Sequence, residues 1–265
     1  MSFMTTTAAQ TPDVHQDKPH TYYIVDFTNP APGKEDEYNW WYDAHHAPDV
    51  VANPGFVSSQ RFVASDKQLQ DIETPRKYLT IYTIVTDDLA AVHEENSRRL
   101  RTGIIPVSPA LDLPSTIFYT YKAMEPVIEH EGHDAPTGEL QTYCLLVFSS
   151  ADPEKAEEYN KWFGDAHALR DIVVTPGFLT GQRLALLGVN ASPTSGPYAG
   201  PHPLYPRLAL FRMATNDLTS VFDAFNRHAP PSGTSLIYVF KTHGPLIDGD
   251  KIRAQCAGIT VSPCP

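Results

Sequence analysis

Hydrophobic residues in the first half of the chain form four short β-branched and aromatic runs, separated by two segments of helical character. The runs predict strands at 21–29, 55–65, 77–86 and 115–124. The segment 31–49 predicts a helix, because acidic residues occupy its first turn. Asp87 and Asp88 provide an N-cap for a second helix at 88–101. The resulting order is βαββαβ, the ferredoxin-like split βαβ unit.

The second half of the chain repeats this order. Strands are predicted at 140–150, 177–188, 206–214 and 234–243, with helices at 152–171 and 216–228. The stretch "EYNWWYDAHHAPDVVANPGFVSSQRF" (37–62) aligns with "EYNKWFGDAHALRDIVVTPGFLTGQRL" (158–184). Both contain Glu-Tyr-Asn, a Trp, Asp-Ala-His, Pro-Gly-Phe and Gln-Arg in the same order. The chain is therefore an internal duplication.

The duplication predicts five segments. They are a disordered tail at 1–20, a first unit at 21–126, an acidic linker at 127–139, a second unit at 140–247 and a C-terminal extension at 248–265. The tail lacks the basic start and apolar stretch of a secretion signal. The segment between the second and third strands of the second unit is longer than its counterpart in the first. Such a long segment is either a lid or binding loop or the result of neutral sequence drift.

Composition narrows the class of protein. Of 265 residues, 42% are hydrophobic and 19% charged, as in globular proteins that bury a core. A net charge of −11 disfavours nucleic acid and anionic membrane surfaces as partners. No apolar run reaches the length of a membrane span, and the three cysteines have no metal-ligand spacing and no even framework. We expect a cytoplasmic protein.

The pattern "EYNxWYxxxHxxDxxxxPGFxxxQR" inside a βαββαβ unit resembles the dimeric α/β-barrel superfamily, and within it EthD-type domains. The resemblance implies an α+β fold in which two four-stranded antiparallel sheets close into a barrel with the helices outside. One chain with two units can form this barrel by itself, or pair its halves with those of a second copy as a homodimer. The superfamily contains cofactor-free cyclases, isomerases, lyases and monooxygenases, haem enzymes and proteins of no known activity, so the resemblance leaves the reaction open.

The first predicted helix carries an aromatic stripe that ends in histidine. Tyr38, Trp41 or Tyr42, and His45 recur at helical spacing and share the face towards the sheet. Aromatic residues on that face, including Trp162 of the second half, are core residues by default. A buried imidazole needs a polar partner or a ligand. In the superfamily that this pattern resembles, small molecules bind between the helices and the sheet. The resemblance therefore implies that a His on this face acts as a general acid or base.

The two halves differ at this histidine. The second half has one more residue between its Trp and its Pro-Gly-Phe, so His167 aligns with either His45 or His46. Gly164 at the extra position predicts either a π-bulge or a tolerated insertion. Ala168 stands where the first half has its second His. We therefore favour the first half as the working pocket, the alternative being a His pair that interacts with the helix dipole.

The candidate catalytic residues are Tyr42, His45, His46 and Asp49, with His167 as their counterpart in the second half. Asp49, four residues after His45, either orients the imidazole and raises its basicity or caps the next turn. The candidate substrate-binding residues are Trp41, Tyr22, Tyr82, Tyr119, Tyr121, Arg61, Trp162 and Arg183. The two arginines, on equivalent strands, either pair with a carboxylate or hold a carboxylate or enolate of the substrate.

Other chemistries have no motif in this sequence. There is no Gly-rich phosphate loop, no Gly-x-Ser-x-Gly elbow and no Cys with a plausible triad. Adjacent His45 and His46 lack the spacing that places two imidazoles on one metal ion. We therefore expect no metal and no cofactor, although a single axial His would suffice for haem.

The expected function is a cofactor-independent enzyme acting on a small aromatic, polyketide-like or otherwise apolar substrate. A helix His supported by Tyr would move a proton next to a carbonyl or phenol, as in a lyase, isomerase or cyclase. One alternative is a cofactor-free monooxygenase of the same fold. The other is a non-catalytic module for ligand binding or dimerisation, in which the His residues are structural.

Overall fold

The computed structural model describes residues 18–130, 140–150, 152–165, 167–191 and 204–256. Most of the predicted tail (1–17) and linker (131–139), the centre of the long second-half loop (192–203) and the end of the predicted extension (257–265) lie outside these residues. No helix among the described residues is both long enough and apolar enough to cross a membrane.

The first unit contains β1 (His20–Thr28), α1 (Glu35–Trp41), the π-helical turn η1 (Tyr42–His46), α2 (Ala47–Val51), β2 (Phe56–Ala64), β3 (Tyr78–Thr86), α3 (Leu89–Arg101), the 3-10 turn η2 (Leu113–Ser115) and β4 (Ile117–Ala123). Its strands run antiparallel in the order β4-β1-β3-β2. The Asp88 side chain accepts from the Ala91 N–H, which confirms the predicted N-cap of α3.

The second unit contains β6 (Thr142–Ser149), α4 (Pro153–Gly164), α5 (Ala168–Val173), β7 (Phe178–Ala191), β8 (Arg207–Ala214), α6 (Leu218–Asn226) and β9 (Ser235–Asp248). Its order, β9-β6-β8-β7, is the same as that of the first unit. Two elements were not predicted. A two-residue strand, β5 (Ile128–Glu129), pairs with β7, and α7 (Gly249–Cys256) follows β9.

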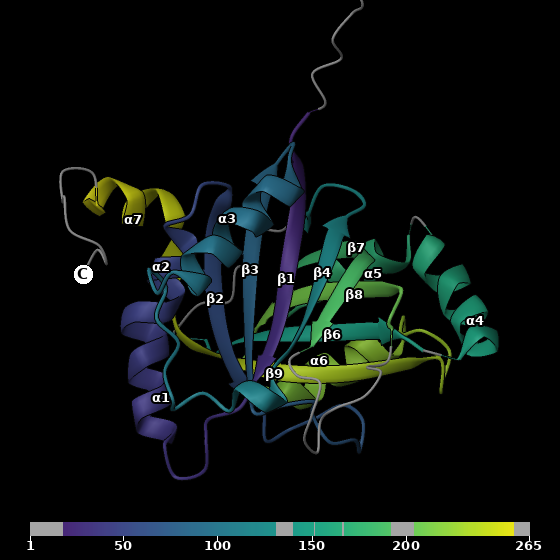
Figure 1. The fold of residues 1–265 in the computed structure, drawn as a ribbon. Coiled ribbons are helices and arrows are strands. Elements are labelled where there is room, and N and C mark those ends of the chain that lie inside the picture. Colours follow the sequence, from purple (N-terminus) through teal and green to yellow (C-terminus); the bar gives the residue numbers. More distant parts are fainter. Residues whose placement is uncertain (1–17, 131–139, 151, 166, 192–203, 257–265) are drawn as a thin grey trace, which may run out of the picture.

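The two sheets join edge to edge into a closed barrel of eight antiparallel strands (Figure 1). β2 pairs with β9, and β4 pairs with β7, so each unit supplies the edge strands that the other lacks. The helices lie outside (Figure 1). Bulky apolar side chains fill the interior, among them the nearly fully buried Phe27, Phe62, Leu146, Phe148 and Phe240. This confirms the predicted α+β fold of two ferredoxin-like units, closed within one chain.

The repeated Pro-Gly-Phe motif has a packing reason in both units. Gly55 and Gly177 have φ angles of +90° and +94°, which favour glycine. A Cβ added to Gly55 would lie 2.6 Å from Cγ2 of Val92 on α3, and one added to Gly177 would lie 2.5 Å from Cγ2 of Val221 on α6. The motif therefore makes a tight turn into the second strand beneath the second helix of each unit.

The helices before these turns differ from the prediction. The sequence allows a π-bulge at Gly164 in the second half, but α4 ends there and α5 begins at Ala168. The π-helical turn lies instead in the first half, at Tyr42–His46, within a helical segment that continues from Glu35 to Val51. The first half, which lacks the extra residue, has one continuous helical segment. The second half, which has the extra residue, has two separate helices, α4 and α5.

Candidate active site

A row of polar residues crosses the sheet of the first unit. Asp26 on β1 pairs in register with Thr80 on β3, and Thr80 pairs with Arg61 on β2. Arg61 pairs with His243 on β9, so the row continues across the junction of the two units. Side chains alternate between the faces of a strand, and this row alternates with residues that face the barrel interior. It therefore lies on the face that α1 and η1 cover.

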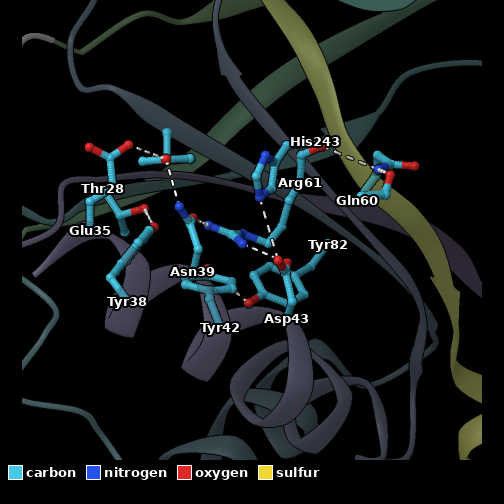
Figure 2. Close-up of polar contacts among 12 residues, drawn as sticks. Thr28, Glu35, Tyr38, Asn39, Tyr42, Asp43, Gln60, Arg61, Tyr82 and His243 are labelled. Carbon is cyan, nitrogen blue, oxygen red and sulfur yellow. Dashed lines mark hydrogen bonds and ion pairs between the residues drawn. The ribbon is translucent and has the colours of Figure 1, made fainter.

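The guanidinium of Arg61 is the centre of this row (Figure 2). Its Nη1 donates to Oδ1 of Asp43 at 2.5 Å, and its Nη2 donates to Oδ1 of Asn39 at 3.0 Å. Its Cζ lies 4.3 Å from the ring centre of Tyr42. Nε2 of His243 lies 3.4 Å from Oδ2 of Asp43. Burial would raise the pKa of Asp43, but hydrogen bonds from His243 and Arg61 outweigh it, so that this pKa is lowered.

Asp26 is the only acidic residue on β1, and it is buried. Its Oδ2 accepts from the hydroxyl of Tyr42 at 3.0 Å, and the same hydroxyl lies 3.0 Å from that of Tyr82. Because Tyr42 gives its single proton to Asp26, Tyr82 is the donor of the second hydrogen bond. Burial raises the pKa of Asp26 to about 7, against the opposing effects of the Tyr42 hydrogen bond and the Arg61 charge. This carboxyl group therefore titrates near neutral pH.

Several buried polar atoms around this network have no hydrogen-bond partner among the described residues. They are Oδ1 of Asp26, Oγ1 of Thr80, Nε of Arg61 and Nδ1 of His46. Buried polar atoms in native proteins are nearly always paired, so each unpaired one needs an explanation. Three of these four belong to residues in register on adjacent strands. Polar groups of a bound molecule would satisfy such a set.

The π-helical turn explains why Trp41, Tyr42 and His46 all lie against the sheet side. The Ala47 N–H bonds to the Tyr42 carbonyl, which is the wider i to i+5 turn. The ring of His46 lies 4.6 Å from that of Trp41 and 4.9 Å from that of Tyr42. Burial, with a smaller effect of the Arg61 charge, lowers the pKa of His46 to about 4. His46 is therefore neutral at pH 7.

The other predicted catalytic residues do not join this network. His45 is half-buried and its ring packs edge-on against that of the exposed Trp40 at 4.7 Å. Asp49 is buried on α2, and its Oδ2 has no hydrogen-bond partner among the described residues. Burial raises the pKa of Asp49 to about 6, while the charges of His45 and Arg99 oppose this. His167 is exposed at the start of α5. Two of the five predicted catalytic residues thus meet.

The four predicted tyrosines divide between the two faces of the sheet. Tyr22 and Tyr82 face the helices and pack in one cluster with Val92 of α3. Tyr119 and Tyr121 face the barrel interior. They are therefore separated from Asp26 and Tyr42 by the sheet itself, and only Tyr82 takes part in the polar network.

The two tryptophans make the same hydrogen bond in both units. Nε1 of Trp41 donates to the Pro106 carbonyl at 3.2 Å, and Nε1 of Trp162 donates to the His228 carbonyl at 2.7 Å. Each bond ties the first helix of a unit to the segment after its second helix. A contact repeated in both units is consistent with the default interpretation of these tryptophans as core residues.

Arg183 is ion-paired in the same way as Arg61. Its Nη1 lies 3.0 and 3.1 Å from the two carboxylate oxygens of Glu125, and its Cζ lies 5.9 Å from the ring centre of Phe163. Both arginines therefore pair with a carboxylate of the protein, which is the first of the two roles expected for them.

The second unit replaces the polar network with apolar side chains. Val147 pairs with Ala209, and Ala209 pairs with Arg183, which matches the register of the polar row in the first unit. The counterparts of Asp26, Thr80, Tyr42, Tyr82 and His46 are Val147, Ala209, Phe163, Phe211 and Ala168. All five counterparts are buried. The same fold is therefore built once with a polar centre and once with an apolar one.

The polar network is covered on most sides. Tyr42 is 1% exposed and Asp26 8% exposed, whereas the side chains of Asp43 and His243 are 43% and 31% exposed. Asp43 and His243 thus form its solvent-facing edge. Within the part of the chain that the structure describes, no group of three or more His, Cys, Asp or Glu residues is arranged to hold a metal ion.

Comparisons with known proteins identify the fold. The sequence matches no protein-family model, and no curated protein matches it either. An anthrone oxidase-like protein is 12% identical, with a TM-score of 0.51, over 94% of this chain and 97% of that chain. Provisionally assigned monooxygenases from Fusobacterium nucleatum and Lactobacillus acidophilus are 10% and 8% identical, with TM-scores of 0.48 and 0.45. They cover 87% of this chain and 94% and 97% of their own. At 12% identity, the likeness to the anthrone oxidase-like protein shows the fold alone, which is the eight-stranded α+β barrel described above.

Proposed function

We propose that the first unit is a cofactor-independent active site that removes a proton from an aromatic ketone or phenol, with Asp26 as the base. The observation that carries this proposal is the Asp26 carboxyl group, whose pKa is raised to about 7 and whose Oδ1 has no partner among the described residues. A base works best when its pKa lies near the operating pH. His46, with a pKa of about 4, is the weaker base at pH 7.

The proposed step is a single proton transfer. A C–H or O–H proton of the substrate passes to Oδ1 of Asp26, and the bonding electron pair moves into the substrate as an enolate or phenolate. The hydrogen bond from Tyr42 to Oδ2, extended by Tyr82, holds the carboxylate in place before the transfer. The pKa of Tyr42 is raised well above its ordinary value by burial, so this residue keeps its proton.

Neutral donors and aromatic walls supply the rest of the site. In this proposal, the hydroxyl of Thr80, which pairs in register with Asp26, and the neutral imidazole of His46 donate hydrogen bonds to the developing oxyanion. The rings of Trp41 and Tyr42 supply apolar surface for the body of the substrate. Asp26 is covered, so substrate access requires η1 to move away from the sheet. A π-helical turn at this position is consistent with that role.

The enolate has two fates, which correspond to the two enzyme classes expected from the sequence. Reprotonation at another atom gives the isomerase outcome. Expulsion of a leaving group from the neighbouring carbon by the electron pair gives the lyase outcome, and attack of the enolate carbon on a second carbonyl of the substrate gives the cyclase outcome. Reaction of the enolate with molecular oxygen gives the monooxygenase outcome, in which anthrone and O2 become anthraquinone and water. The fold likeness to an anthrone oxidase-like protein makes anthrone a reasonable probe. The finer EthD-type assignment, the small aromatic substrate and a homodimer stay predictions.

The test follows the proton directly. The purified chain is mixed with anthrone in D2O without oxygen, and exchange of the methylene protons is measured by NMR. The same mixture is then assayed with oxygen in an oxygen electrode. We expect exchange above the uncatalysed rate, and a loss of at least about 100-fold in Asp26→Asn, the usual scale of general-base catalysis. The matched control is Asp223→Asn, which removes an exposed carboxylate from α6.

The covered position of the network favours one competing interpretation, in which these residues form a purely structural core. That interpretation predicts that Asp26→Asn leaves the exchange of every phenol and ketone probe unchanged while altering only stability. Exchange that needs oxygen, or that survives in Asp26→Asn but not in His46→Ala, would instead assign the base to another group.

A further inference from the structure

A cavity of about 160 Å³ lies at one end of the barrel interior, on the other side of the sheet from Asp26. It is lined by Tyr23, Ser58, Gln60, Ile81, Thr83, Val127, Thr180, Gln182, Leu210, Arg212 and Leu246. Gln60 and Arg61 are neighbours on β2, and their side chains point in different directions (Figure 2). Gln60 lines the cavity and Arg61 lies in the polar network, so the sheet separates the cavity from the proposed active site. Val127 and Leu246 are exposed, so the cavity opens to solvent there.

Arg212 gives this cavity an uncompensated positive charge. Its Nε is buried without a hydrogen-bond partner, and its Cζ lies 5.0 Å from the ring centre of Phe62. None of the residues that line the cavity is Asp or Glu. Arg61 and Arg183, which occupy equivalent positions in the two units, are both paired with carboxylates of the protein. Arg212, on β8, has no ion pair with any described residue. A half-buried guanidinium of this kind binds a carboxylate or phosphate when one is present.

Two glutamines from equivalent strands add fixed polar groups. Gln60 Nε2 donates to the carbonyls of Arg61 and Gly244, and Gln182 Nε2 donates to the carbonyl of Glu125. Oε1 of Gln182 accepts from the hydroxyl of Tyr23 at 2.5 Å. These bonds fix both amides, which are 5% and 4% exposed, before a ligand arrives. Pre-organised polar groups of this kind give orientation and specificity to small-molecule sites.

We propose that this cavity binds a single-ring aromatic carboxylate, with the carboxylate on Arg212 and the ring against Ile81 and Leu210. The volume supports one ring: a cavity of about 150 Å³ is known to hold benzene. The side chains of Ile81 and Leu210 beside the Arg212 cation favour an aromatic acid over a free inorganic anion, which would leave those two side chains uncovered. The site uses the interior of the barrel and none of the residues assigned to proton transfer.

The test uses benzoate as the probe and benzamide as its neutral counterpart of the same shape. Binding to the full chain is measured by calorimetry and by the shift in melting temperature, since a ligand of the folded state raises it. We expect benzoate to bind and benzamide to bind at least about 10-fold more weakly, because a charge-assisted hydrogen bond is lost. Arg212→Gln should weaken benzoate about 10- to 100-fold and leave benzamide unchanged.

The matched control is Arg170→Gln, which removes an exposed arginine from α5. If Arg212→Gln does not fold, Leu210→Trp fills the cavity instead and should block benzoate while Arg212 is kept. The proposal is overturned if benzoate fails to bind at millimolar concentration, if benzamide binds equally well, or if sulfate binds as tightly as benzoate. Anthrone exchange in Arg212→Gln should match wild type, so failure here is distinct from failure of the proposed active site.

Discussion

Replacing Asp26 by Asn should stabilise the folded protein at neutral and alkaline pH. The carboxyl group has a pKa of about 7 in the folded chain, against an ordinary value of 3.8. The folded state therefore holds this proton more tightly than the unfolded state does. As pH rises from about 4 to 7, the unfolded chain loses the proton first, and the free energy of unfolding falls. Asn has no charge to bury, so it avoids this loss.

The size of the effect follows from the two pKa values. Their difference is about 3 units, and each unit corresponds to about 1.4 kcal/mol, so ionised Asp26 costs about 4 kcal/mol above pH 8. In Asp26→Asn, the carbonyl of the new amide can still accept from Tyr42. We expect a net gain of about 2–4 kcal/mol at pH 8, which falls by about 3 kcal/mol on going to pH 4.5.

The assay is urea unfolding of wild type and Asp26→Asn at a series of pH values from 4.5 to 8. The difference between the two proteins isolates Asp26, because other titrating groups contribute to both. Asp223→Asn, an exposed carboxylate change, should give a difference near zero at every pH. A variant that is less stable than wild type at pH 8, or a difference that does not change with pH, would refute the assignment of a high pKa to this carboxyl group.

Three further changes test other parts of the structure. Burial lowers the pKa of His46 to about 4, so the free energy of unfolding of the wild type should fall by about 3 kcal/mol as pH falls from 6.5 to 4. Urea unfolding of His46→Leu should not show this fall, and equal pH curves for the two proteins would mean that the imidazole is in water. Gly55→Ala should cost at least about 1 kcal/mol more than Gly33→Ala in thermal unfolding, because both have positive φ but only the first drives its Cβ into Val92; equal costs would contradict the close contact. Residues 21–126 expressed alone should form dimers or aggregates in light scattering, because β2 and β4 lose their partners in β9 and β7; a stable monomer would contradict the shared barrel.

The fold was predictable because the duplication doubled the signal. Each strand and helix could be read twice, and the Pro-Gly-Phe turn appeared in both halves with the same flanking pattern. The strand β5 was left unassigned although it has a counterpart, the end of β9: Ile128 pairs with Gly181 of β7 as Ile247 pairs with Ser59 of β2. The helix α7 has no counterpart among the described residues, and it is held by the bonds of Arg253 to the carbonyls of Val51 and Phe56 rather than by local propensity.

The site was harder to predict than the fold. Tyr42 and His46, which lie in the polar network, were among the candidates because the aromatic stripe of a helix can be predicted from spacing. The period changes within η1, so His46, rather than His45, packs against Trp41 and Tyr42. Asp26, the proposed base, was not a candidate because a single acidic residue in a strand gives no spacing pattern. One signal was available. Asp26 and Val147 occupy equivalent positions of the duplicated strand, and it costs free energy to bury an Asp at a position where the other unit has a Val.

The second unit shows that this fold does not need a polar centre. It has Val147, Ala209 and Phe163 where the first unit has Asp26, Thr80 and Tyr42. Its four-stranded sheet nevertheless has the same strand order, and helices cover it as in the first unit. Because both units solve the same packing problem, the polar set of the first adds no stability that the apolar set could not provide, and ionised Asp26 subtracts about 4 kcal/mol. Replacing a buried polar set by apolar residues of similar shape is commonly neutral or stabilising. Transplanting the apolar residues into the first unit should therefore give a more stable barrel, and proton exchange on anthrone is the property that we expect it to lose.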